Sequence, residues 1–320
     1  MCMYPARITP IRLFKSTGLC AMVLWLAACS AEVDAIHTMT TPTPLPAPDL
    51  SFTCVHSRDA DIPVTPEAQA LFDKARALEK APGPKDFDAI ARTYEQAVAL
   101  GHWKAMQNVQ ILYYQGLTTH PAPALRVTEL NEKLIALGAA IGYYNMANNL
   151  ETGYGVKQDK KAALAYYRKS ADLGSPDGQA YVGNKLIFGF NKDDIGKSML
   201  ECAVAQNSAL GAKNLADYHL LVSKDLGLML QALQKSTELG NSMAAFGLYK
   251  IFKTGNTDIS EHAPIAIDIE RTNRYLTIYN TLKRNPRVKI PEINSIVPLP
   301  PAPLPEWDGS FSFQRQPSAQ

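Results

Sequence analysis

The sequence lacks the residue patterns that mark most metal sites. Its histidines are isolated from one another, at His37, His56, His102, His120, His219 and His262. There is no histidine pair at metal-ligand spacing, and no two of the five cysteines are close in the sequence. Acidic residues are dispersed, so no acid and base pair for catalysis can be nominated. We therefore expect no metal site, no cofactor, no catalytic residue and no enzyme activity.

A strong charge of either sign is also missing. The 32 Lys and Arg residues nearly balance the 30 Asp and Glu residues, giving a formal net charge of +2. Three of the basic residues precede Cys29 and no acidic residue does, so the chain from Cys29 onwards carries about −1. This balance gives no electrostatic reason to expect nucleic acid or a polybasic membrane contact.

No apolar run is long enough to span a bilayer. The apolar run from Leu19 to Ala28 has ten residues, where a membrane helix needs about 20. It follows the basic residues Arg7, Arg12 and Lys15, which is typical of a secretory signal. Residues 1–28 are therefore interpreted as a signal peptide.

The end of this run, Leu26-Ala27-Ala28-Cys29, resembles a bacterial lipobox. That resemblance implies that Cys29 is lipidated and that the protein is anchored in the periplasm. Ser30 follows the cysteine, which by the same resemblance favours the outer membrane. A plain secretory signal with an incidental cysteine is the alternative.

Residues 29–64 contain a segment rich in Thr, Pro and Ala, including Thr41-Pro42-Thr43-Pro44-Leu45-Pro46. Such a composition cannot bury a core and favours extended conformations. We predict that residues 29–64 are a flexible tether between the lipid and a folded domain.

Five residues that readily adopt a left-handed backbone conformation recur at an almost constant interval. They are Gly101, Gly138, Gly174, Asn207 and Gly240, spaced 37, 36, 33 and 33 residues apart. Each follows a run rich in Ala, Leu and Lys, so they are predicted to be five helix C-termini. A period of this length indicates an array of helical repeats.

After each stop a second helix is expected, with apolar or small residues at offsets of 4, 8 and 11. The clearest series are Ala105, Val109, Tyr113 and Gly116, then Gly142, Met146, Leu150 and Gly153, then Gly178, Val182, Leu186 and Gly189. This spacing keeps one helix face towards its neighbour.

One copy resembles the Sel1-like repeat, a relative of the tetratricopeptide repeat. The residues that carry the resemblance are Met146, Ala147, Leu150, Gly153-Tyr154-Gly155-Val156, Asp159, Ala163, Tyr166-Tyr167, Ser170-Ala171 and Gly174. Family members typically have Leu-Gly in place of Met146-Ala147 and Tyr in place of Leu150. The resemblance covers about residues 85–255. It implies an all-α fold, an α-solenoid or superhelix of stacked antiparallel helix pairs, which we assign to residues 65–260.

Residues 261–320 are predicted to form a C-terminal helix and a proline-rich tail. Helical spacing extends from Ile265 to Arg284, and Pro291 to Pro305 is rich in proline and precedes Trp307. The tail either caps the apolar end of the array or is a partner-binding motif.

Two cysteines remain if the first two leave with the signal and Cys29 is lipidated. Cys202 occupies a position that is polar in the other repeats, so we expect it on the solvent-facing side of its helix. An exposed thiol in an oxidising compartment tends to pair, and Cys54 is its only intramolecular partner. A disulfide between Cys54 and Cys202 is therefore predicted, with two free thiols as the alternative.

The concave face of the array is the expected partner surface. The first helix of each pair is the one that follows a stop, and its positions that the packing pattern leaves free are Ile111, Tyr114, Gln115, Tyr144, Asn145, Asn148, Glu151, Tyr181, Asn184 and Lys185. Tyrosine with Asn and Gln suits protein recognition, because aromatic anchors contribute much interface energy and amides add directional bonds. Ordinary inter-helix packing is the alternative role for each of them.

The layout of lipobox, proline-rich tether, Sel1-like repeats and tail resembles a group of bacterial immunity lipoproteins. The resemblance includes Arg284-Asn285-Pro286-Arg287-Val288-Lys289-Ile290-Pro291 and Leu304-Pro305-Glu306-Trp307-Asp308-Gly309. It implies a protein that binds and blocks a secreted toxin, such as a phospholipase-like effector of type VI secretion. A general envelope scaffold, or assembly adaptor without inhibitory role, is the alternative.

Overall fold

The computed structural model of the chain describes residues 51–255, 265–285 and 287–315. The chain divides into two compact units, residues 1–41 and 42–320, and the described residues all lie in the second. The predicted signal peptide, Cys29 and most of the predicted tether lie outside the described residues.

The described residues form helices and turns, with no β-strand among them. After a short 3₁₀ helix, η1 (Asp59–Asp61), the helices are α1 (Pro66–Lys80), α2 (Phe87–Ala99), α3 (Trp103–Tyr114), α4 (Pro123–Ala136), α5 (Ala140–Thr152), α6 (Lys160–Asp172), α7 (Pro176–Phe190), α8 (Asp193–Ala205), α9 (Ala209–Leu221), α10 (Leu226–Glu238), α11 (Ser242–Thr254), α12 (Ile269–Arg284), α13 (Ile293–Ile296) and α14 (Ser312–Arg315). In this part of the chain, no helix has the length and apolar character that crossing a membrane requires.

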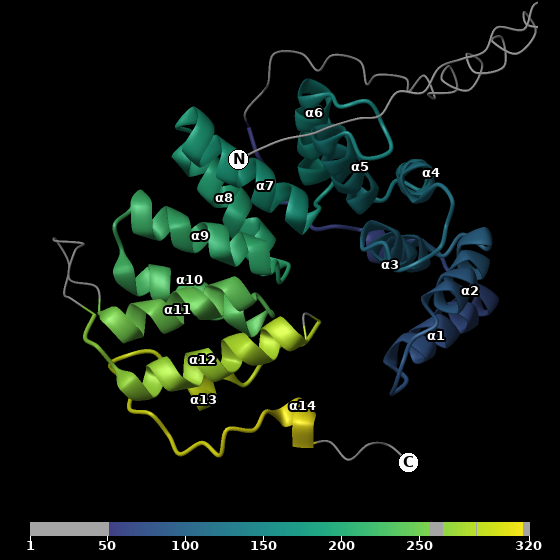
Figure 1. Cartoon of the computed structure of the whole chain (residues 1–320). Coiled ribbons are helices and arrows are strands. Elements are labelled where there is room, and N and C mark those ends of the chain that lie inside the picture. The colour runs from purple at the N-terminus through teal and green to yellow at the C-terminus, as the bar shows by residue number, and fades with distance from the viewer. Residues whose placement is uncertain (1–50, 256–264, 286, 316–320) are drawn as a thin grey trace, which may run out of the picture. The chain divides into compact units, whose positions relative to one another are not determined.

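Consecutive helices pack against each other from α1 to α12 (Figure 1). The packing is most extensive within the pairs α5/α6, α7/α8, α9/α10 and α11/α12. The first helices of neighbouring pairs also meet, α5 with α7 and α7 with α9. This is the all-α solenoid of antiparallel helix pairs that the repeat predicts.

All five predicted helix stops adopt the left-handed conformation. The φ angles are 81° at Gly101, 74° at Gly138, 88° at Gly174, 62° at Asn207 and 102° at Gly240. Each stop makes the same pair of backbone bonds; at the first, Gly101 N–H donates to Val98 and His102 N–H donates to Ala97. These bonds satisfy the last helix carbonyls, so a short sequence signal ends each helix in the same way.

The helix after each stop begins with a side-chain cap in four of the five cases. His102, Ser175, Ser208 and Asn241 each accept a hydrogen bond from a backbone N–H in the first turn of the helix that follows. The equivalent residue before α5 is Ala139, which has no such side chain. Asp59 supplies the missing acceptor from another part of the chain, at 2.7 Å from Ala140 N and 3.1 Å from Ile141 N.

Residues 51–62, which we call the strap, lie against the array. Gln179 donates to the Val55 carbonyl at 2.7 Å, and Ser57 N–H donates to Gln206 at 2.8 Å. Gly174 lies so close to the strap that a Cβ there would be 2.5 Å from the His56 carbonyl carbon. The end of the segment predicted as a flexible tether is therefore fixed, because its backbone groups bond to side chains of the repeats.

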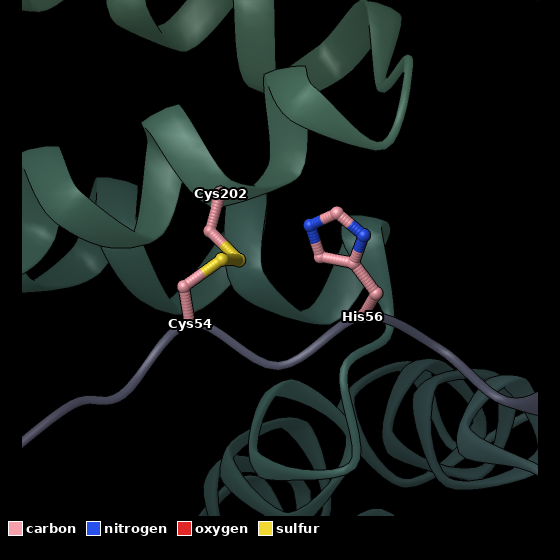
Figure 2. Close-up of side chains that lie close together, drawn as sticks. All are labelled: Cys54, His56 and Cys202. Carbon is pink, nitrogen blue, oxygen red and sulfur yellow. A yellow bond between two sulfur atoms is a disulfide. The ribbon is translucent and has the colours of Figure 1, made fainter.

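The structure contains a disulfide between Cys54 of the strap and Cys202 of α8 (Figure 2). The two Cα atoms are 5.6 Å apart and 148 residues apart in sequence. Cys202 is only 3% exposed, so the expectation that it faces solvent is wrong. The equivalent positions Gln96 and Lys169 are exposed, whereas the strap lies over Cys202.

The C-terminal tail packs on the last helices of the array. Val297 and Phe311 are buried in a cluster with residues of α11 and α12, and Leu304 and Trp307 pack against it. Buried arginines of α12 hold the tail backbone: Arg271 donates to the Pro298 carbonyl at 3.0 Å, and Arg274 donates to that of Pro305 at 2.8 Å. This packing supports the capping interpretation of the tail.

Candidate protein-binding groove

An open groove of about 600 Å³ lies between α3 and α5. Its lining residues are Tyr114, Asn145, Asn148, Asn149, Thr152, Gly153 and Tyr154. Tyr114 comes from the last turn of α3, the amides and Thr152 come from α5, and Tyr154 follows the α5 C-terminus. The groove is positioned by the repeat, because its walls come from α3 of one repeat and α5 of the next.

Tyr114 and Tyr154 provide the aromatic surface of this groove. Their ring centroids are 4.7 Å apart, and Tyr114 remains 44% exposed. The Tyr114 hydroxyl donates to the buried amide oxygen of Asn149, which fixes the ring without covering it. Burial raises the pKa of Tyr114 to about 12, so its hydroxyl stays protonated at neutral pH.

A cluster of tyrosines around one carboxylate lies beside the groove. The rings of Tyr167 and Tyr181 stack with centroids 3.7 Å apart, and Tyr144 packs edge-on against Tyr167 at 5.5 Å. The Tyr181 hydroxyl donates to Glu151 at 2.7 Å, and the Tyr167 hydroxyl lies 2.8 Å from both Glu151 and Asn148. We call these five residues the tyrosine–carboxylate cluster.

The hydroxyls of this cluster stay protonated over the physiological range. Burial and the bond to Glu151 both raise the pKa of Tyr167 above its usual value. The same two causes raise the pKa of Tyr181. Glu151 therefore keeps two neutral donors, which hold its carboxylate in place on the α5 surface.

The structure brings together most of the residues predicted for partner binding. Tyr114, Asn145 and Asn148 line the groove, and Tyr144, Glu151 and Tyr181 belong to the adjacent cluster. Lys185 lies over the Tyr181 ring at 5.4 Å. The remaining three, Ile111, Gln115 and Asn184, are exposed or half-buried and do not line the groove.

Sequence reasoning missed several groove residues. Asn149, Thr152, Gly153 and Tyr154 line it but were not predicted as binding residues, and neither was Tyr167 of the cluster. Tyr154 and Tyr167 belong to the residues that carry the resemblance to the repeat, and that resemblance assigns them no binding role. Their position beside Tyr114 and Asn148 depends on how α3, α5 and α6 stack, which no local pattern specifies.

A second cavity, of about 610 Å³, lies over α2 and the loop before α4. Three of its charged groups already have partners, because Arg126 forms an ion pair with Glu95 at 2.6 Å and Thr119 donates to Asp88. We assign it a structural role.

Cys54, His56 and Cys202 form the one group among the described residues whose potential metal ligands converge, within 4.8 Å of one another (Figure 2). The two sulfur atoms are bonded to each other, so neither is a thiolate. A disulfide sulfur is not a ligand of zinc sites, so this group forms a cross-link and not a metal site.

Solved structures with the same fold include immunity proteins. Immunity protein Pa5087 from Pseudomonas aeruginosa matches with a TM-score of 0.62 and 27% identity, covering 79% of this chain and 96% of that one. Immunity protein PA5088 from the same organism matches with a TM-score of 0.65 and 28% identity, covering 79% and 95%. A Sel1 repeat protein from Oxalobacter formigenes matches with a TM-score of 0.51 and 21% identity, covering 67% and 87%.

A family model described as a domain of unknown function, DUF6396, matches residues 244–320. That range contains nearly all of α11, then α12 and the capping tail. No curated protein matches the sequence. The three structures named above are immunity and repeat proteins, and the chain is a helical-repeat protein of Sel1-like fold that resembles the immunity proteins of Pseudomonas aeruginosa.

Proposed function

We propose that this protein is an immunity protein that binds a toxin through the groove and the tyrosine–carboxylate cluster. The observation that carries the proposal is the exposed Tyr114 ring, held by Asn149 in a groove lined by amides. The fold supports it, since the match extends over 96% of immunity protein Pa5087.

The groove has the chemistry of a protein interface. Tyrosine rings supply apolar area with little conformational entropy to lose, and a hydroxyl that can bond at the rim. Asn145 and Asn148 add donors and acceptors on the same wall. Inhibition follows from steric occlusion: a partner seated on this face has its own active site or membrane-docking surface covered. No catalytic step is assigned to the immunity protein.

The proposal places the protein in the periplasm, held in the outer membrane by a lipid on Cys29. It rests on the lipobox-like sequence and the apolar run before it, which lie outside the described residues. The proposed target is a phospholipase-like effector of type VI secretion. Metabolic labelling with a fatty acid tests the anchor: wild type should be labelled and Cys29→Ala should not, and equal labelling would contradict it.

Protection of living cells tests the function. A strain that lacks this gene and carries the effector should show self-intoxication, and the wild-type gene should restore growth. A Tyr114→Ala/Asn148→Ala variant should fail to restore growth. The matched control is Leu125→Ala/Leu164→Ala, which removes exposed apolar side chains of α4 and α6 outside the groove. Healthy growth of the deletion strain would contradict the immunity role and favour an envelope scaffold.

A further inference from the structure

A cluster of lysines and aromatic rings lies on α11 and α12, away from the groove. It consists of Phe246, Tyr249, Lys250, Lys253, Tyr279 and Lys283, and we call it the lysine–aromatic patch. The Phe246 ring lies 5.6 Å from Tyr249 and 5.1 Å from Tyr279, measured between centroids. Two neighbouring helices thus build one continuous aromatic surface.

One lysine side chain lies close to each ring of this patch. Lys250 Nζ lies 5.9 Å from the Phe246 centroid, Lys253 Nζ lies 5.3 Å from that of Tyr249, and Lys283 Nζ lies 5.7 Å from that of Tyr279. All three lysines are exposed, while the rings are half-buried. Lys250 and Lys283 are attracted to their rings by cation–π interaction, whereas Lys253 Nζ donates a hydrogen bond to the Tyr249 hydroxyl at 2.9 Å, and all three keep their positive charge.

Some lysines elsewhere in the array form ion pairs with acidic residues, whereas those of the patch pair with no acid among the described residues. Lys197, Lys213 and Lys235, on α8, α9 and α10, each form an ion pair with an acid three or four residues along the same helix. Helix α11 contains no acidic residue. No carboxylate of the described residues forms an ion pair with a patch lysine, and the one acid of α12, Glu270, pairs with Arg274.

Lys250 of the patch and Asn148 of the groove occupy equivalent positions of their repeats. Asn148 lies six residues after Gly142, the third residue of α5, and Lys250 lies six residues after Ala244, the third residue of α11. Equivalent positions of a regular repeat face the same way. A single partner that covers the groove can therefore extend along the face to the patch.

We propose that the lysine–aromatic patch is a second contact surface for the protein partner and binds a segment of it rich in Asp and Glu. Three lysines without an ion pair to the described residues favour carboxylates, and the neighbouring rings suit the side chains of a protein segment. The patch is small for nucleic acid, whose binding modules bury about 600–1,000 Å² and carry larger basic surfaces. The inference rests on the proposed function, since it describes the same partner.

Fluorescence anisotropy with a labelled decaglutamate peptide tests the chemistry. At low ionic strength, about 20 mM salt, the full chain should bind the peptide, and binding should weaken as salt screens the charges. Lys250→Glu/Lys253→Glu should weaken binding at least tenfold. The control Lys160→Glu/Lys161→Glu changes the net charge equally on exposed lysines of α6 and should leave binding within about twofold of wild type, because surface charges far from a contact contribute little.

Three results would overturn the proposal: no peptide binding, equal weakening by both double variants, or patch-dependent binding of phosphatidylglycerol vesicles without peptide binding. The last would assign the patch to a membrane surface. The growth test above separates this inference from the proposed function. Suppose that the groove variant abolishes protection, while the patch variant protects fully and binds the peptide as tightly as wild type does. In that case only the assignment of the patch is lost, and the proposed function stands.

Discussion

Removing the disulfide should destabilise the array, and the size of the loss can be worked out from the structure. The cross-link joins residues that are 148 positions apart, so it restricts a large part of the unfolded chain. The chain-entropy relation gives about 5 kcal/mol for a loop of this length. This is an upper value, because the strap can detach when the bond is absent while the helices stay folded.

We therefore expect Cys54→Ser/Cys202→Ser to lower the free energy of unfolding by about 2–5 kcal/mol. Urea denaturation followed by far-UV circular dichroism measures the change. Dithiothreitol should shift the wild-type midpoint to that of the double variant, and it should have no effect on the double variant itself.

Hydrogen exchange locates the effect. Ala140 and Ile141 N–H donate to Asp59 of the strap, so these amides should exchange faster once the strap is released. If reduction changed neither the midpoint nor these amides, the strap would not depend on the cross-link. Two titratable thiols on folded, unreduced protein would refute the reasoning at its first step.

Three further predictions concern single residues. Asp59→Ala should cost about 1 kcal/mol, the typical value of a lost helix cap, measured by urea denaturation; an unchanged midpoint would contradict the cap. Gly178→Ala should lower the free energy of unfolding by about 1–2 kcal/mol, because the added Cβ would lie 2.8 Å from the preceding helix. Gly189→Ala, where the added Cβ would lie in open space, should raise it by about 0.5–1 kcal/mol. The reverse order of stability would contradict this packing argument. Burial acts to raise the pKa of Glu95, but hydrogen bonds and the charge of Arg126 bring it below its usual value. The stabilisation is therefore fully present above about pH 4.5 and is lost as the pH falls through the lowered folded-state pKa. Glu95→Gln should lower the free energy of unfolding at pH 7 by about 0.5–1 kcal/mol, and its difference from wild type should shrink as the pH is lowered further. A difference that did not shrink in acid would contradict the ion-pair account.

The helix boundaries could be predicted because their signals are local. A Gly or Asn that takes positive φ ends a helix within a few residues, so Gly101 and Gly240 identify two stops without any knowledge of the fold. The pairing of Cys54 with Cys202 could also be predicted from the sequence, because only these two thiols remain after the signal peptide and Cys29 are set aside. Cys202 was nevertheless placed in solvent, because the strap that covers it is distant in sequence.

Contacts between residues that are distant in sequence could not be predicted from local patterns. The sequence shows that Ala139 cannot cap α5, but nothing near it identifies Asp59, which lies 80 residues earlier, as the substitute. The same holds for the groove: Tyr114 and Asn148 were selected from helical spacing, whereas Tyr154 reaches Tyr114 only through the stacking of neighbouring repeats. The alignment of repeats in space determines which of the free positions become a site.

The central claim is that the face formed by α3, α5 and α7 binds a toxin. Isothermal titration of the full chain with its proposed target, a phospholipase-like effector, tests this claim most directly. We predict tight binding by wild type and a loss of at least about 100-fold for Tyr114→Ala/Asn148→Ala, the size expected for central anchors of an interface. The Leu125→Ala/Leu164→Ala control should bind as wild type does. Equal affinity of all three proteins, or no binding by wild type, would contradict the account.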